Sequence, residues 1–379
     1  MQREKRTIII FRSRDDSTLE HYAKKLEENY DATDVKILPF INGISCLLKG
    51  EHLYALDADG DIEAVEEDLT LTLPPFYEEK GTSWWYLRWK FPKWDENHQI
   101  IPLGVERIGA RRVWERTTGK EVKVAVLDTG IDINHPDLKI NVAEGINLVS
   151  PGVVPEDDHG HGTHIAGIIA AADNSSGVIG VSPAAQLYPV KVLNSRGEGT
   201  LTHILEGLQW CVDNGIQVIN MSFGTDSHSV ALEKAITVVH RAGIVMVAAA
   251  GNDGTNFSVD FPAAYHQTVA VGAVTSGDRL AWYSSRGSEI TLVAPGDRVL
   301  STIRGGRYGR LSGTSMATAH VTGAVALLLQ MKPELEPWQV IKILTGSAEK
   351  LRRLKENQQG AGLVRADKCI HCNTGAFFF

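Results

Sequence analysis

The sequence is poor in cysteine and has no long apolar run. Its 379 residues include only four cysteines, which are too few and too widely spaced for a disulfide framework. No segment is long enough to span a membrane, and the apolar run "TIIIF" near the basic N-terminus is shorter than the apolar core of a signal peptide. We therefore expect no membrane anchor and, from this sequence alone, a cytoplasmic protein. The alternative is a secreted protein whose export signal is missing from this chain.

Positive charge is also scarce, since 38 Lys and Arg stand against 46 Asp and Glu, for a formal net charge of −8. This balance argues against a general nucleic-acid-binding protein. Residues 75–97 depart from it, because four of the eight tryptophans interleave there with Arg88, Lys90 and Lys93. Such a pattern can stack on single-stranded nucleic acid. The chain as a whole is acidic, so we interpret the segment as a Trp-rich linker across apolar surface and expect no nucleic-acid partner.

The composition, 43% apolar and 22% charged, suffices for one large core and a small second domain, and nothing in it requires a dimer. We expect a monomer. Residues 1–74 predict a small α+β domain: a strand at "TIIIF", a helix in "STLEHYAKKLEENY", two strands around Asn42-Gly43, then a short helix and a closing strand. This order is that of a ferredoxin-like split βαβ unit.

Residues 98–368 predict an α/β domain. Apolar runs such as "KVAVLD", "IQVINMS" and "GIVMVAAAGN" resemble strands buried on both faces, and helical stretches separate them. This alternation indicates a doubly wound, mostly parallel sheet with helices on both faces. Chemistry should then gather at the carboxyl ends of the strands, where Asp128, Ser222 and Asn252 stand.

The stretch "HGHGTH" leaves two interpretations open. A zinc site needs a carboxylate where Thr163 stands, and no further ligands can be assigned. An acyl-transfer site needs a nucleophile, a base, an orienting carboxylate and an oxyanion donor. Asp128 ends a strand, and Ser315 opens a long apolar helix whose N-terminus favours an anion. Each such residue alone is usually a cap or a turn, so the set matters more than any member.

Five motifs together resemble the subtilisin family of serine endopeptidases: "VAVLDTGID", "HGTHIAG", "INMSFG", "AAAGND" and "SGTSMATAH", in the order Asp, His, Ser. The resemblance covers residues 98–368 strongly and 1–74 more loosely. It implies Ser315 as nucleophile, His161 as general base and Asp128 as the carboxylate that orients it. Asn252 and the Ser315 N–H would form the oxyanion hole. One departure is Ala319, where the family usually has proline.

The resemblance also implies that protein or peptide substrates bind in extended form between segments 197–199 and 222–224. Asp260 falls where many relatives carry a small residue, which suggests a preference for Lys or Arg before the cut. If Asp260 points to solvent instead, that preference disappears. The implied substrate-binding residues are Leu193, Gly197, Gly199, Leu201, Ile204, Ser222, Phe223, Gly224, Ala249, Ala250, Gly251 and Asp260.

A structural Ca²⁺ site is implied at Gln99, Asp137 and Asn174, all with hard oxygen ligands. An ordinary Asn-Ser-Gly turn is the alternative interpretation of that loop.

Residues 1–74 resemble the family's propeptide, an intramolecular inhibitor and folding aid, which implies a self-inhibited zymogen. Relatives are cut near the position of Pro74-Pro75, where a proline after the bond makes a poor substrate. Cleavage within 76–98, for example at Lys80-Gly81, is one outcome. A binding or inhibitory module whose inhibitory domain never leaves is the rival. The tail, residues 369–379, carries Cys369 and Cys372 in a lone C-x-x-C, and we expect it to be chemically idle.

Overall fold

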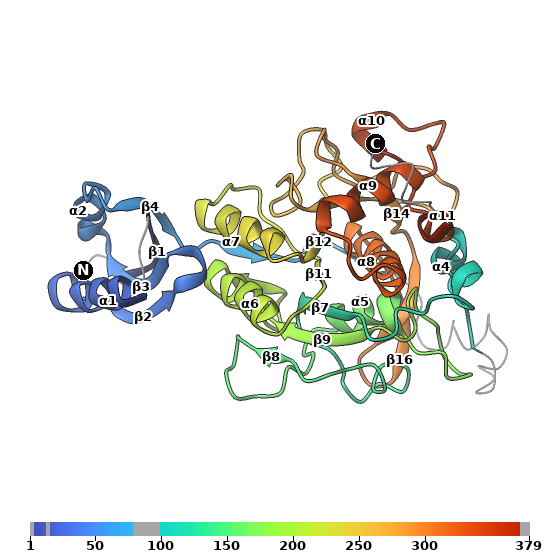
Figure 1. Cartoon of the computed structure of the whole chain (residues 1–379), viewed down its shortest axis with the longest axis horizontal. Coiled ribbons are helices and arrows are strands. Elements are labelled where there is room, and N and C mark those ends of the chain that lie inside the picture. The colour runs from blue at the N-terminus through green and yellow to red at the C-terminus, as the bar shows by residue number, and fades with distance from the viewer. Residues whose placement is uncertain (1–3, 13–15, 79–98, 372–379) are drawn as a thin grey trace.

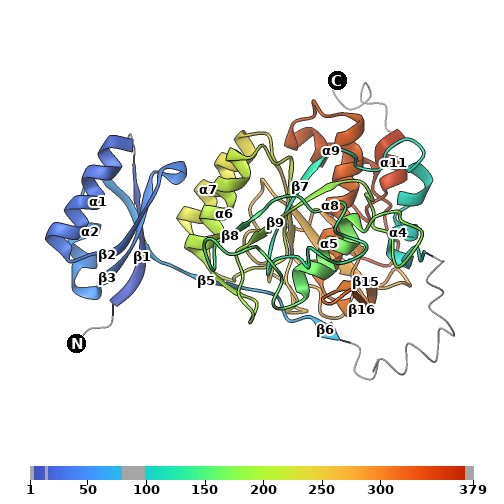
Figure 2. The ribbon, with the colours of Figure 1, turned by 90° about the horizontal axis from the view of Figure 1, so that it is seen from below.

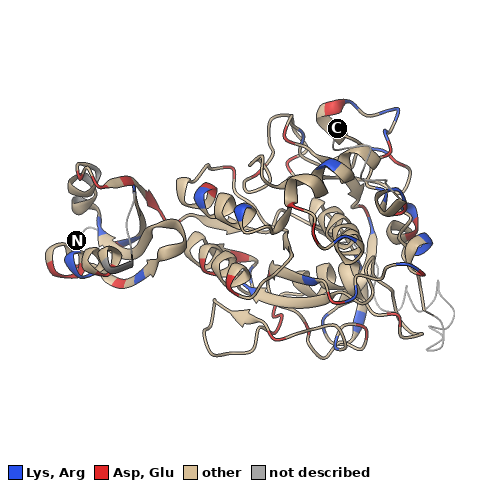
Figure 3. Cartoon of the chain, in the orientation of Figure 1, with Lys and Arg blue, Asp and Glu red and all other residues tan. Residues whose placement is uncertain are grey.

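The computed structural model describes residues 4–12, 16–78 and 99–371. Two bodies share the chain, a small N-terminal domain and a larger one that carries the rest (Figure 1). Acidic and basic residues are interspersed over both (Figure 3). Within the described ranges, no helix combines the length and apolarity of a membrane span.

The small domain is a four-stranded antiparallel sheet in the order β2-β3-β1-β4 with helices on one face. Ile9 of β1 points to the helices and contributes to the domain's own core, whereas Ile8 and Ile10 join an apolar cluster of the larger domain. Alternate side chains of β1 therefore point to opposite faces of the sheet and contribute to two different hydrophobic cores. Its elements are β1 (Glu4–Phe11), α1 (Asp16–Tyr30), β2 (Thr33–Leu38), β3 (Gly43–Lys49), α2 (Leu53–Asp57) and β4 (Ile62–Glu67).

The larger domain is built on a seven-stranded parallel sheet in the order β14-β13-β12-β11-β7-β9-β8, as predicted. In strand β7, Val124 and Val126 pack on the α5 and α8 side, whereas Ala125 and Leu127 pack on the α6 and α7 side. The strands are β7 (Lys123–Asp128), β8 (Ile146–Asn147), β9 (Gln186–Lys191), β11 (Val218–Met221), β12 (Val245–Ala249), β13 (Val269–Val274) and β14 (Leu292–Pro295).

Helices cover both faces of this sheet, with α6 and α7 turned toward the small domain (Figure 2). The helices are α4 (Leu103–Arg107), α5 (His161–Ala170), α6 (Leu201–Asp213), α7 (Val230–Arg241), α8 (Thr314–Met331), α9 (Pro337–Ser347), α10 (Glu356–Gln359) and α11 (Ala366–His371). Outside the main sheet lie β5 (Thr70–Thr72), β6 (Tyr77–Glu78), β10 (Glu198–Thr200), β15 (Val299–Ile303) and β16 (Arg307–Ser312).

The packed part of the chain extends beyond residue 368, where the sequence suggested that an idle tail begins. Cys369 and Ile370 are buried on α11, and the Cys369 sulfur lies 3.0 Å from the Ser347 hydroxyl. The tail assignment is therefore wrong for these residues, because a six-residue helix is too short for its apolar face to be recognised from periodicity. Cys372 lies outside the described residues.

Candidate active site

Asp128 and His161 form a buried pair at the carboxyl end of β7. Both Asp128 oxygens accept from Nδ1 of His161, at 2.8 and 2.9 Å, and neither side chain is exposed. A carboxylate in this position fixes the imidazole ring and leaves the lone pair on Nε2. Nε2 is buried without a hydrogen-bond partner among the described residues. The pair therefore presents a proton acceptor to the space beside it.

Ser315 lies in the first turn of α8, close to the same strand ends. Its hydroxyl is buried and donates to the Ser222 carbonyl at 3.3 Å, rather than to His161. The helix runs without interruption through Ala319, the position at which proline was absent. The hydroxyl must rotate away from Ser222 to reach an imidazole.

Asn252 is oriented by the same helix start. Its side-chain oxygen accepts from the Thr314 N–H at 3.0 Å and from the Thr314 hydroxyl at 2.9 Å. The amide nitrogen is thereby turned the other way, and it donates to the Pro75 carbonyl at 2.8 Å. This is the distance at which a donor stabilises a carbonyl oxygen that gains negative charge.

Residues 70–78, which we call the strap, run through the whole site as one extended segment. β5 pairs antiparallel with β10, Leu73 donates to the Gly197 carbonyl, and Thr72 exchanges two hydrogen bonds with Gly224. Leu71 is fully buried in an apolar cluster that also contains Leu193, Leu201, Ile204 and Phe223. Beyond Pro75 the strap continues as β6, which pairs with β16. The two segments predicted to bind substrate thus hold a peptide of this chain.

Known proteins share this architecture. The sequence profile described as the subtilase family matches residues 119–362. The chain belongs to the subtilase family. Subtilisin amylosacchariticus of Bacillus subtilis subsp. amylosacchariticus is 47% identical over 258 residues, which cover 67% of this chain and 67% of that protein. An alkaline protease of Shouchella clausii is 40% identical over 325 residues, which cover 86% of this chain and 78% of that protein.

A solved structure agrees. Fervidolysin from Fervidobacterium pennivorans, described as a keratinolytic enzyme related to subtilisin, superposes with a TM-score of 0.83 at 27% identity. The match covers 98% of this chain but 62% of that one. The chain is therefore a subtilisin-like serine endopeptidase.

In this subtilase, Asp260 lies beside Gly224 and Gly251, in the loops that follow the neighbouring strands β11 and β12. A side chain built on Gly251 would meet Oδ2 of Asp260 at 2.5 Å, and one built on Gly224 would meet its Cβ at 2.7 Å. Its backbone N–H donates to the carbonyl of Ala250, which with Ala249 forms the predicted pocket wall. Burial, reinforced by the charges of Asp253 and Asp226, raises the pKa of Asp260 to about 7.

Gln99, Asp137 and Asn174 also come together. The Gln99 amide nitrogen lies 2.6 Å from the Ala172 carbonyl, 3.0 Å from the Val178 carbonyl and 3.4 Å from the Asn174 side-chain oxygen. These three oxygens therefore converge on one point. The buried Asp137 carboxylate lies next to them and accepts a hydrogen bond from the Asn174 amide. Turning the Gln99 amide would add a fourth oxygen, so these residues fit a hard cation.

The three histidines of "HGHGTH" serve different partners. His164 is buried and bonds the Val299 and Gly309 carbonyls through Nε2, and burial lowers its pKa to about 3. Burial, then the charge of His161, lowers the pKa of His159. Among the described residues no three His, Cys, Asp or Glu side chains are grouped to hold a metal ion. The geometry thus favours the acyl-transfer interpretation over zinc.

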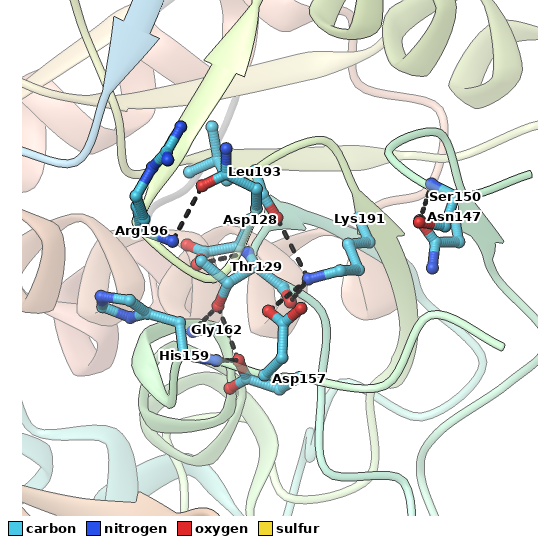
Figure 4. Close-up of polar contacts among 12 residues, drawn as sticks. Asp128, Thr129, Asn147, Ser150, Asp157, His159, Gly162, Lys191, Leu193 and Arg196 are labelled. Atoms are coloured by element: carbon cyan, nitrogen blue, oxygen red, sulfur yellow. Dashed lines mark hydrogen bonds and ion pairs between the residues drawn. The ribbon is translucent and has the colours of Figure 1, made fainter. Parts of the chain in front are cut away.

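Asp157 and Lys191 were missed from the sequence, although both bond to Thr129, the residue that follows Asp128 (Figure 4). Asp157 is buried and accepts five hydrogen bonds, from the Thr129 hydroxyl, from the N–H groups of His159 and Gly160, and from both donors of Thr163. Lys191, nearly buried, donates to the Thr129 carbonyl and to Asp158. In the sequence, the only indication of this hydrogen-bond network is that Asp157 stands four residues before the first residue of a helix.

Replacing Asp157 by alanine should destabilise the protein by about 3 kcal/mol, because buried N–H and hydroxyl donors lose their acceptor. Urea unfolding of a Ser315→Ala background, which prevents self-digestion, measures the change. Asp213→Ala, an exposed aspartate that ends α6, is the matched control and should change stability by less than about 0.5 kcal/mol. Equal effects of the two substitutions would contradict a supporting role for Asp157.

Proposed function

We propose that this protease is made as a self-inhibited zymogen whose catalytic groups are Ser315, His161, Asp128 and Asn252. The observation that carries the proposal is the Pro75 carbonyl on the Asn252 amide, beside the buried Asp128–His161 pair. A peptide carbonyl is thus held by a side-chain donor directly next to a nucleophile and a base.

The groups support a two-step acyl transfer. Ser315 Oγ attacks the substrate carbonyl carbon and its proton moves to Nε2 of His161, while Asp128 stabilises the imidazolium. The oxygen becomes an anion and receives hydrogen bonds from Asn252 and from the Ser315 N–H at the start of α8. His161 then protonates the departing amine. Water, deprotonated by His161, hydrolyses the acyl-enzyme in the same way.

The small domain acts as the intramolecular inhibitor on this proposal. Glu66 accepts hydrogen bonds from the Ser229 hydroxyl and from the N–H groups of Val230 and Ala231, at the start of α7. Asp68 accepts from the N–H and the hydroxyl of Thr202, at the start of α6. Carboxylates are favoured at helix N-termini, so the two contacts support stable docking.

The strap supports inhibition rather than cleavage at Pro74-Pro75. In a productive complex, the residue whose side chain enters the primary pocket also supplies the carbonyl at the oxyanion donor. Here Pro74 is buried and Pro75 is exposed, yet the carbonyl on Asn252 belongs to Pro75. On this proposal the buried ring of Pro74 fills the primary pocket, so the peptide is out of register by one residue. Removal of the inhibitor then requires a cut in the part of the chain that follows the strap.

Asp260 is proposed to select Lys or Arg before the cut, because its carboxyl lies against Gly224 and Gly251, next to the predicted pocket wall. The cation that fits Gln99, Asp137 and Asn174 is proposed to be a structural Ca²⁺, which would stabilise the loop that follows α5.

Wild-type protein incubated with Ca²⁺ should lose an N-terminal piece, whereas Ser315→Ala should stay whole, as followed by intact mass. The new N-terminus should fall within 76–98. If Asp260 selects Lys before the cut, cleavage after Lys80 should make Gly81 the new N-terminus. Asn252→Ala should process about 100- to 1,000-fold more slowly, a range known for such a donor in a subtilisin. If wild type and Ser315→Ala both stay whole, the rival function, an inhibitory module that is never released, is favoured.

The preference of the mature enzyme for a Lys over a Leu substrate should grow about tenfold from pH 6 to pH 8. The pKa of Asp260 is about 7, so its carboxyl is mostly neutral below that pH and charged above it. The ratio of the two kcat/KM values is the measurement, because titration of the catalytic base cancels in it. Asp260→Asn should abolish the growth, whereas Asp253→Asn, at an exposed position, should retain most of it. Equal cleavage of both substrates at pH 8 would reject the preference.

Chelation should lower the Tm of full-length Ser315→Ala by roughly 5–10 °C, since a site filled at 100 times its Kd contributes about 2.7 kcal/mol. Asp137→Asn should start from a lower Tm and show no response to chelator. Glu144→Gln, an exposed carboxylate away from the cluster, is the control and should respond as its parent does. A chelator effect that survives in Asp137→Asn would place the cation elsewhere.

A further inference from the structure

Lys191 is a buried cation at the carboxyl end of the main sheet. Among the buried residues of the described part of the chain it is the only lysine, and no arginine is buried there. Its Nζ donates to the carbonyls of Thr129 and Leu193, at 2.6 and 3.1 Å, and to the carboxylate of Asp158, at 2.7 Å. The Asp158 side chain is 48% exposed, so solvent screens its charge more than that of Lys191. Lys191 therefore places net positive charge in the interior.

Thr129 connects this cation to two buried carboxylates. Its N–H donates to Asp128, its hydroxyl donates to Asp157, and its carbonyl accepts from Lys191, at 2.8, 2.8 and 2.6 Å (Figure 4). Both carboxylates are fully buried. Two negative charges that share one residue repel each other, and their removal from water is costly unless a cation lies close. The charge of Lys191 provides this compensation.

The same charge balance acts on the imidazole of His161. Asp128 accepts from Nδ1, and the neutral ring keeps a lone pair on Nε2 with which it can take a proton. Negative charge nearby favours the imidazolium form, which has no such lone pair. A cation opposite the two carboxylates therefore favours the form of His161 that acts as a base.

The other titratable groups nearby are neutral, exposed or already bonded. They are His159, Asp132 and Glu156 of the loops, His164 of α5, His320 of α8 and Arg304 between β15 and β16. Burial lowers the pKa of the three histidines, to about 3 for His164 and about 4 for His320, so these rings are neutral at pH 7. Arg304 and Glu156 are exposed, and Asp132 accepts from the Gly305 N–H.

We propose that Lys191 is a positioning residue for the catalytic base, whose buried ammonium offsets Asp128 and Asp157 and thereby keeps His161 neutral. The proposal rests on the proposed catalytic groups and adds a residue that touches neither the substrate nor the reacting atoms. A full charge one peptide group away, at an effective dielectric constant of about 20, moves a titration midpoint by roughly 1 pH unit. Loss of a positive charge favours the imidazolium, so it moves the midpoint upward.

The test is the pH profile of kcat/KM for the processed enzyme with one peptide substrate. Lys191→Met removes the charge and should move the acid side of the profile up by roughly 1 pH unit, with the plateau at high pH kept within about threefold. Lys191→Arg retains the charge and should leave the midpoint in place. Lys123→Met, at the amino end of β7, is the matched control and should leave the profile unchanged. An equal loss of kcat/KM at every pH would indicate a structural role alone and overturn the proposal.

Asp158→Asn tests the same balance with the opposite sign, at a half-exposed position that tolerates the change if Lys191→Met does not fold. The variant leaves the charge of Lys191 less neutralised, so the acid side of the profile should move to lower pH. An unchanged profile, or a move to higher pH, would overturn the proposal.

A measurement without catalysis separates this proposal from the proposed function. In full-length Ser315→Ala, the low-field proton resonance of the Asp128–His161 hydrogen bond, identified by its loss in His161→Gln, reports protonation of the imidazole by NMR. Its midpoint should rise by roughly 1 pH unit in Lys191→Met. An unchanged midpoint overturns the role of Lys191. A raised midpoint in a protein whose wild type cleaves no peptide would retain that role and reject the proposed function.

Discussion

The buried carboxylate of Asp128 is the constraint on which the rest of the site depends. A charge inside the sheet is tolerated only when it is paired and hydrogen-bonded, and Asp128 meets this condition through His161 and the Thr129 N–H. The start of α5, where His161 stands, must therefore lie against the carboxyl end of β7, where Asp128 stands. Asp157, in turn, holds the turn before α5 by its backbone N–H groups. A parallel sheet supplies this geometry, because its strand ends meet along one edge.

On the proposed function, substrate and inhibitor would use the same main-chain groups. Gly197, Gly224 and Asn252 offer donors and acceptors that any extended peptide can pair with, and the strap pairs with all three. A tethered strap would compete at a high effective concentration, so modest contacts would suffice to exclude free peptides. The carboxylates of Glu66 and Asp68 and the apolar contacts of Ile8 and Ile10 keep that concentration high by docking the small domain on α6 and α7.

The sequence was sufficient for the sheet, its helices and the position of Asp128, because buried strands and motif order are local signals. It was not sufficient for the path of the strap after Pro75. The contacts of Tyr77 with Trp282 and β16 join residues about 200 positions apart, and no local sequence pattern predicts such contacts. Asp157 was missed for a related reason, since a loop aspartate shows its role only when its five donors surround it. Cys369 was misplaced because a short helix gives no period to recognise.

The strap also differs chemically from the substrate that the pocket is proposed to prefer. Asp260 would favour a cation, yet the strap offers prolines where a Lys or Arg would go. Its affinity must then come from elsewhere: from Leu71 in the apolar cluster, and from the ring contacts of Phe76 with His161 and of Tyr77 with Trp282. A peptide that offers proline rather than a cation to the primary pocket, and whose carbonyl is displaced by one residue, would be held firmly and positioned poorly for attack. On the proposed function, this division, with strong binding on both sides and a slipped carbonyl at the centre, would distinguish the inhibitor from a substrate in the same groove.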